Sequence, residues 1–143
     1  MRLVAAMVVV ATALAPVGCG RQAQQSGVDY TKVRVMGEFY SSYIDEHRGQ
    51  PPKDEQAFRG YLTRKEEQLK KVGLTVDEMF TSPRGSGPIE WVYGKQPPLG
   101  SSGMAYFAYE KAPVDGKRLV IGSRGGSEQL DESQFRKAFP KAS

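Results

Sequence analysis

The chain has 143 residues, enough for one domain of ordinary size, and its apolar residues, 39% of the total, are densest in the first 18 positions. It contains one Cys and one His, which excludes an internal disulfide framework, a cysteine-based zinc site and a multi-histidine metal site. The formal net charge of +4 is a mild and dispersed excess, so we expect no nucleic-acid partner. Since the chain also has no paired-histidine helix and no calcium-binding loop motif, we expect no metal and no cofactor.

Residues 1–18 have the pattern of an export signal. Arg2 supplies a positive start, and an apolar or nearly apolar segment runs from Leu3 to Ala15 before Pro16 interrupts it. A membrane-spanning helix needs about 20 such residues, whereas the apolar core of a signal peptide needs roughly 7–15. The sequence therefore predicts a signal peptide over residues 1–18.

The end of this segment, Pro16-Val17-Gly18-Cys19, resembles a bacterial lipoprotein signal, in which the peptidase cuts before a Cys that then carries lipid. Gly18 matches the small residue of that motif, whereas Pro16 stands where Leu is usual. The resemblance implies lipidation of Cys19 and firm attachment to a membrane, since several acyl chains anchor a protein stably. By the sorting rule of enterobacterial lipoproteins, a residue other than Asp after the Cys, here Gly20, implies a periplasm-facing protein of the outer membrane. A plain secretory signal with a chance Cys is the alternative.

The helical part of the mature chain follows a short polar segment. Residues 19–28 are Gln-rich and predict a flexible tether, and residues 29–140 predict a single α+β domain. Asp29 is a suitable N-cap for a helix over Tyr30–His47. One face of that helix carries Val33, Met36, Tyr40, Tyr43 and His47. Gly37 interrupts the helix pattern and would allow another element to approach closely.

A second helix is predicted over Glu55–Val72, with Asp54 as its cap, followed by a short helical turn over Thr75–Phe80. From Thr81 onward Gly and Pro are too frequent for helices. The β-type runs are Ile89–Tyr93, Met104–Glu110 and Arg118–Gly122. Asp115-Gly116 predicts a hairpin turn between the last two runs, and Asp131 is a cap for a final helix ending at Phe139. These elements predict helices packed on a three-stranded antiparallel sheet.

The segment that ends the first helix resembles planctomycete pseudopilin-like proteins and type II secretion pseudopilins. Tyr43, His47 and Pro51-Pro52 fall at the spacing of that family, whereas Gly49 lies one place late. The order of strand, short strand and helix over 119–139 also looks like the end of a pseudopilin head. The resemblance implies such a head without its polymerising stalk, because a lipoprotein-type signal and a polar tether occupy the place of the stalk.

Two candidate chemistries have ordinary structural alternatives. His47 could act as a general base only with a nucleophile or carboxylate in reach, and we expect it instead to cap the first helix, where positive charge is favourable. The loop Ser82–Pro88 could form an anion-binding nest beside Arg84, but it lacks the lysine and the context of a phosphate loop. We expect a turn there, and likewise at Ser123–Ser127.

Aromatic residues are frequent in the predicted sheet. Alternation places Trp91 and Tyr93 on one face and Tyr106 on the face opposite Phe107. One set is expected to pack on the first helix. The other could be exposed, so Trp91, Tyr93, Tyr106, Tyr109 and Arg84 form a candidate interaction surface.

Taken together, these features predict a lipid-anchored protein of the cell envelope that binds or assembles with an envelope partner and is not an enzyme. The alternative is an accessory small-ligand-binding subunit of an envelope transport or secretion complex. The sequence leaves the oligomeric state open.

Overall fold

The computed structural model describes residues 27–142. The predicted signal peptide, the lipidation residue Cys19 and most of the predicted tether lie outside the described residues. Within residues 27–142, no helix is both long enough and apolar enough to cross a membrane.

The first helix, α1 (Tyr30–Glu46), starts where the sequence predicts it. The carboxylate of Asp29 accepts a hydrogen bond of 3.0 Å from the backbone N–H of Lys32, which makes Asp29 the N-cap. The prediction for Gly37 is also confirmed. A Cβ atom at this position would lie 2.7 Å from the carbonyl oxygen of Gly122 and 3.2 Å from the nitrogen of Gly125, so only glycine lets these backbones meet.

The second predicted helix is two helices. Helix α2 (Glu55–Arg64), capped by Asp54, is followed by α3 (Glu66–Lys71), and the chain bends at Lys65, where φ is −104° and ψ is 13°. Residues 63–68 are all polar, so the apolar pattern does not reveal this bend. The short 3₁₀ helix η1 (Asp77–Phe80) matches the predicted helical turn.

The sheet is antiparallel and has four strands in the order β1-β2-β3-β4. The strands are β1 (Ile89–Trp91), β2 (Tyr106–Glu110), β3 (Lys117–Gly122) and β4 (Ser127–Asp131). The α+β class is confirmed, whereas the expected number of three strands is wrong. β4 pairs with β3 along its whole length, but its sequence SEQLD contains one apolar residue and therefore lacks the usual β-strand signal.

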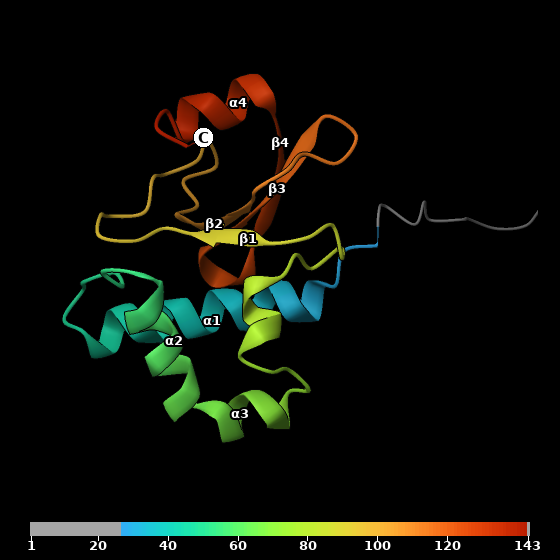
Figure 1. Ribbon diagram of the computed structural model, residues 1–143. Coiled ribbons are helices and arrows are strands. Elements are labelled where there is room, and N and C mark those ends of the chain that lie inside the picture. Colours follow the sequence, from blue (N-terminus) through green and yellow to red (C-terminus); the bar gives the residue numbers. More distant parts are fainter. Residues whose placement is uncertain (1–26, 143) are drawn as a thin grey trace, which may run out of the picture.

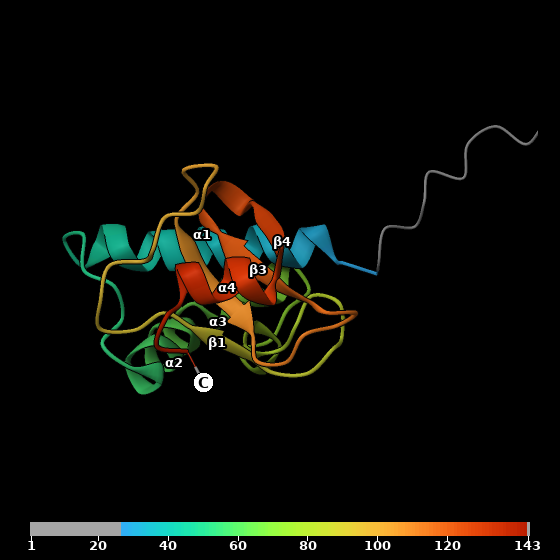
Figure 2. The same cartoon turned by 90° about the horizontal axis from the view of Figure 1, so that it is seen from above.

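Helices cover both faces of the sheet (Figure 1). α1 crosses one face, and α4 (Glu132–Ala138) lies over the other, as Figure 2 also shows from above. The larger apolar core lies between the sheet, α1 and α2, and a smaller one lies under α4. The capping box formed by Asp131 and Gln134 fixes the start of α4. A turn of 3₁₀ helix, η2 (Ser123–Gly125), joins β3 to β4 and touches α1.

Candidate functional site

The aromatic residues of the predicted interaction surface are mainly core residues. Trp91 and Tyr106 are each only 2% exposed. The indole N–H of Trp91 donates to the carbonyl of Met79 at 3.0 Å, and its ring stacks on that of Tyr40 at 5.4 Å between centroids. The expected exposed aromatic patch is therefore wrong for these two residues. The physical reason is that helices cover both faces of the sheet, whereas the sequence predicted a covering helix for only one face.

Tyr93 and Tyr109 are half-buried. Tyr109 packs edge-on against Phe135 of α4 at 5.0 Å between ring centroids and lies 4.6 Å from Phe139. A bulge between Tyr106 and Ala108 shifts the register of β2. Because of this extra residue, Tyr106 and Tyr109 lie on the same face, under α4, although three positions separate them.

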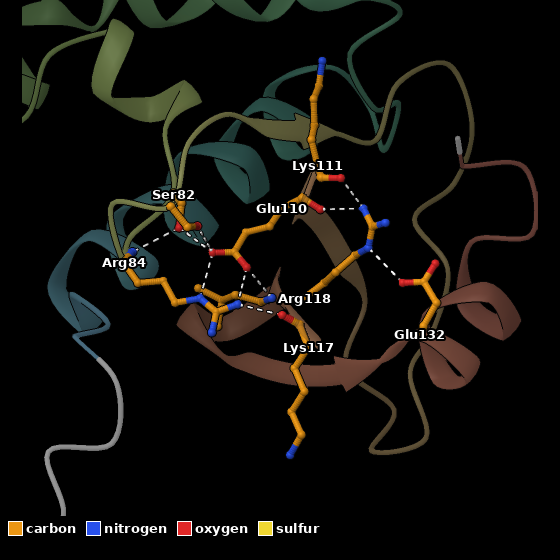
Figure 3. A network of polar contacts seen from close by, with 9 residues as sticks. Ser82, Arg84, Glu110, Lys111, Lys117, Arg118 and Glu132 are labelled. Carbon is orange, nitrogen blue, oxygen red and sulfur yellow. Dashed lines mark hydrogen bonds and ion pairs between the residues drawn. The ribbon is translucent and has the colours of Figure 1, made fainter. Parts of the chain in front are cut away.

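Arg84 is part of a buried polar network rather than of an open surface (Figure 3). Its Nε donates to Oε1 of Glu110 at 2.8 Å, and its Nη2 pairs with Oε2 of the same carboxylate. Ser82 and Ser86 each donate a hydroxyl hydrogen bond of 2.6 Å to Oε1. The backbone N–H of Leu119 donates to Oε2 at 2.8 Å. The Arg84 and Glu110 side chains are 6% and 2% exposed.

The electrostatics of this network follow from its geometry. Burial opposes ionisation of Glu110, but the hydrogen bonds from Arg84, Ser82 and Ser86 outweigh burial and lower its pKa to about 2. The loop that the sequence marked as a possible anion nest therefore does surround an anion, which is the chain's own carboxylate. Because the carboxylate of Glu110 fills the loop, the structure supports the interpretation of Ser82–Pro88 as a structural turn between η1 and β1.

Glu110 was not among the candidate site residues predicted from the sequence. Its available signal is a charged residue at the end of the apolar run MAYFAYE. Arg118 extends the same network toward α4. Its Nη1 donates hydrogen bonds to the backbone carbonyl oxygens of Glu110, at 3.2 Å, and of Lys111. Its Nε donates to the carboxylate of Glu132 at 3.3 Å, and its guanidinium carbon lies 4.5 Å from the centre of the Phe135 ring.

His47 ends α1, as predicted. Its Nδ1 lies 2.7 Å from the carbonyl oxygen of Tyr43, and the two rings stack at 3.8 Å with an angle of 4° between planes. Within residues 27–142, the His47 ring has no hydrogen bond to a serine or a carboxylate. This geometry supports the helix cap. The turn at Ser123–Ser127 is likewise structural, because Ser123 accepts the N–H of Ala105 at 3.2 Å and η2 packs on α1.

Among the described residues, no group of three or more His, Cys, Asp or Glu side chains is placed to hold a metal ion. Comparison of the chain with protein-family models, with curated proteins and with solved structures finds no match.

Proposed function

We propose that this protein is attached to the outer membrane through lipid on Cys19, faces the periplasm, and acts as a non-enzymatic binding or assembly module. One observation carries the proposal. The single Cys of the chain directly follows a short apolar segment and the small residue Gly18. A Cys placed by chance would not be expected at this boundary.

The start of the folded part supports this arrangement. The backbone N–H of Asp29 donates to the carbonyl of Pro83 at 2.8 Å, so the domain is fixed from its first helix cap onward. Residues 19–28 would then connect lipid and domain over at most about 35 Å, given roughly 3.5 Å per extended residue. A domain on such a tether stays close to the membrane and can contact neighbouring envelope proteins.

The state of the reactive side chains supports a role in binding rather than catalysis. Glu110 and Arg84 neutralise each other, and His47 uses Nδ1 to cap α1. The packing of α1 across an antiparallel sheet also supports the proposed likeness to a pseudopilin head. In this proposal the head works from a lipid anchor instead of a pilin stalk.

Labelling with radioactive palmitate tests the anchor. We expect label in the wild-type protein and none in Cys19→Ser, with the wild type in the membrane fraction. The double variant Cys19→Ser/Ser101→Cys is the matched control, because it restores one exposed Cys at a position without the signal motif. Equal label in wild type and Cys19→Ser would overturn the proposal, and label in the double variant would show that any exposed Cys suffices.

A second candidate function, an accessory subunit that holds a small ligand, has one observation in its favour. A hollow of about 320 Å³ lies between residues 99–101 and α4, lined by Tyr106, Leu130 and Lys137. This volume is at the lower end of the range of small-molecule sites. Soaking with a fragment library should place density in this hollow if the second function holds, and a uniformly empty hollow would reject it.

A further inference from the structure

A groove lies between the last turn of α1 and the first turn of α2. Two adjacent hollows of about 420 and 490 Å³ share Tyr43, His47, Lys53 and Ala57 in their walls. The first continues to Arg64 and the second to Pro51 and Arg48. We call this continuous hollow the α1–α2 groove. It is open to solvent and is separate from the Arg84–Glu110 network.

One wall of the groove is a flat, ordered pair of rings. The carbonyl oxygen of Tyr43 can only accept a hydrogen bond, so Nδ1 of His47 carries the proton and donates it. In the neutral ring this leaves Nε2 as an acceptor. Tyr61 packs edge-on against Tyr43 at 5.1 Å between centroids and holds the pair in place. Tyr43 itself is only 7% exposed, so the surface that this wall offers to the groove is mainly the ring of His47, which stacking on Tyr43 holds in one orientation.

The charges around the groove are unbalanced. Arg48, Lys53 and Arg64 are exposed at its rim, and within residues 27–142 neither arginine forms an ion pair. The two acidic residues of the walls are already engaged. Glu46 pairs with Lys65 at 2.9 Å. Asp54 accepts the N–H of Ala57 at 2.8 Å, and its carboxylate lies 4.0 Å from the ammonium group of Lys53. The groove therefore presents two unpaired arginines, Arg48 and Arg64, beside an aromatic wall.

The backbone at the rim is also unusual. Arg48 has a φ of 57°, in the left-handed region, where a residue with a Cβ is disfavoured by about 1–2 kcal/mol. Glycine would remove this cost, and Gly49 directly after it already has a φ of 83°. The side chain of Arg48 is therefore placed at the edge of the groove by a backbone conformation that glycine would adopt at lower cost.

We propose that the α1–α2 groove binds an extended acidic segment of a partner protein. Charge complementarity selects the acidic segment, because clusters of arginine and lysine recognise acidic motifs. The groove is open to solvent, which favours a chain segment over a small molecule, because small-molecule sites enclose most of the ligand surface. The aromatic wall with Pro51 suits an extended backbone, as in grooves that bind proline-rich segments.

The position of the groove agrees with the proposed anchor, on which this inference rests. α1 has 17 residues and is about 25 Å long. The described chain begins at the N-terminal end of α1, and the groove lies at its C-terminal end (Figure 1). A domain tethered by its N-terminus can therefore turn the groove away from the lipid and toward a neighbouring protein.

The test measures binding of a fluorescein-labelled decapeptide of alternating Glu and Pro to the purified full chain in neutral detergent. Peptides with Gln or Lys in place of Glu have the same extended backbone and serve as charge controls. We expect the Glu peptide alone to bind and to shift amide resonances of residues 43–57 and 64. The variant Lys53→Glu/Arg64→Glu should raise the Kd at least about tenfold, because both cations face the peptide.

The matched control is Lys71→Glu/Lys141→Glu, which makes the same charge change at exposed positions outside the groove. Its Kd should stay within about twofold of wild type. Equal weakening in both double variants, shifts spread over the whole surface, or no binding of the Glu peptide at about 1 mM would overturn the proposal. Binding to vesicles with about 30% anionic lipid that is lost only in Lys53→Glu/Arg64→Glu would assign the groove to a membrane surface instead. Palmitate labelling reports on the anchor separately, so failure of the anchor and failure of the groove can be told apart.

Discussion

The two ends of α1 use arginine in opposite ways. Beside its N-terminal end, Arg84 is 6% exposed and fully paired with Glu110. At its C-terminal end, Arg48 and Arg64 are exposed, and within the described part of the chain no carboxylate pairs with either. The paired arginine holds a loop to the sheet, whereas the unpaired ones leave positive charge available to another molecule.

This difference shows that the role of a cation is set by whether the fold supplies its counterion. A buried guanidinium without a partner would be strongly unfavourable, so Arg84 depends on Glu110. An exposed guanidinium is solvated and contributes little to folding. The variants below therefore separate residues that stabilise the domain from residues that are free to bind.

Glu110→Gln should have the largest effect. The substitution keeps the shape of the side chain but leaves Arg84 buried without its counterion, and loss of one partner of a buried pair costs about 3–5 kcal/mol. Urea unfolding measures the change. The matched control is Glu90→Gln, which breaks the exposed pair with Lys111 and should cost less than about 1 kcal/mol. Similar values for both variants would mean that the buried network is no stronger than a surface pair.

The same carboxylate predicts an acid-dependent loss of stability. The pKa of Glu110 is lowered to about 2 in the folded protein, so its contribution is complete above the unfolded-state value near pH 4.5 and is lost as the pH falls toward 2. A shift of this size corresponds to about 3 kcal/mol. Unfolding free energies of wild type and Glu110→Gln, measured across this pH range, should converge as the pH falls. Parallel curves would show that other groups cause the acid sensitivity.

Two glycines in helices should respond to alanine with opposite signs. Gly37→Ala places a Cβ 2.7 Å from the backbone oxygen of Gly122, and overpacking of this kind costs roughly 1–3 kcal/mol. Gly60→Ala in α2 meets only a flexible arginine tip at 3.9 Å and should gain up to about 1 kcal/mol from helix propensity. Thermal unfolding measures both. Stabilisation by Gly37→Ala would show that α1 can move away from η2 to make room for the methyl group.

The same glycine shows which features the sequence could predict. The caps Asp29, Asp54 and Asp131 were predictable because each obeys a local rule of helix initiation. The sequence could predict that some element approaches α1 closely at Gly37, because a glycine inside a helix lowers its stability and is therefore expected where a larger side chain would not fit. Its contact, Gly122, was not predictable, because it lies far along the chain and depends on the tertiary fold.

The candidate sites were harder to predict, for two physical reasons. The β2 bulge reverses alternation after Tyr106, so the period-two rule could not place Tyr109. The pairing of Arg84 with Glu110 joins residues 26 positions apart, and no local pattern encodes such a contact. His47 was correctly interpreted as a cap, but the groove beside it also requires α2 to fold back onto α1.

Arg48→Gly should stabilise the domain modestly. The φ of 57° at this position suits glycine, and removal of the strain should gain about 1 kcal/mol, partly offset by the greater freedom of glycine in the unfolded chain. Differential scanning calorimetry would show a higher Tm. We expect the same variant to bind the acidic peptide more weakly, which would separate stability from binding at one residue. A lower Tm would mean that the side chain of Arg48 stabilises the fold.

The smallest effect on stability is expected for Lys53→Glu/Arg64→Glu. Both side chains are exposed, and Lys53 approaches Asp54 only to 4.0 Å, so the free energy of unfolding should change by less than about 0.5 kcal/mol per residue. Urea unfolding beside Glu110→Gln makes the comparison direct. A loss of several kcal/mol would place these cations in the same structural class as Arg84. A negligible loss, combined with weaker peptide binding, would show that the cations at this end of α1 are retained for contact with another molecule.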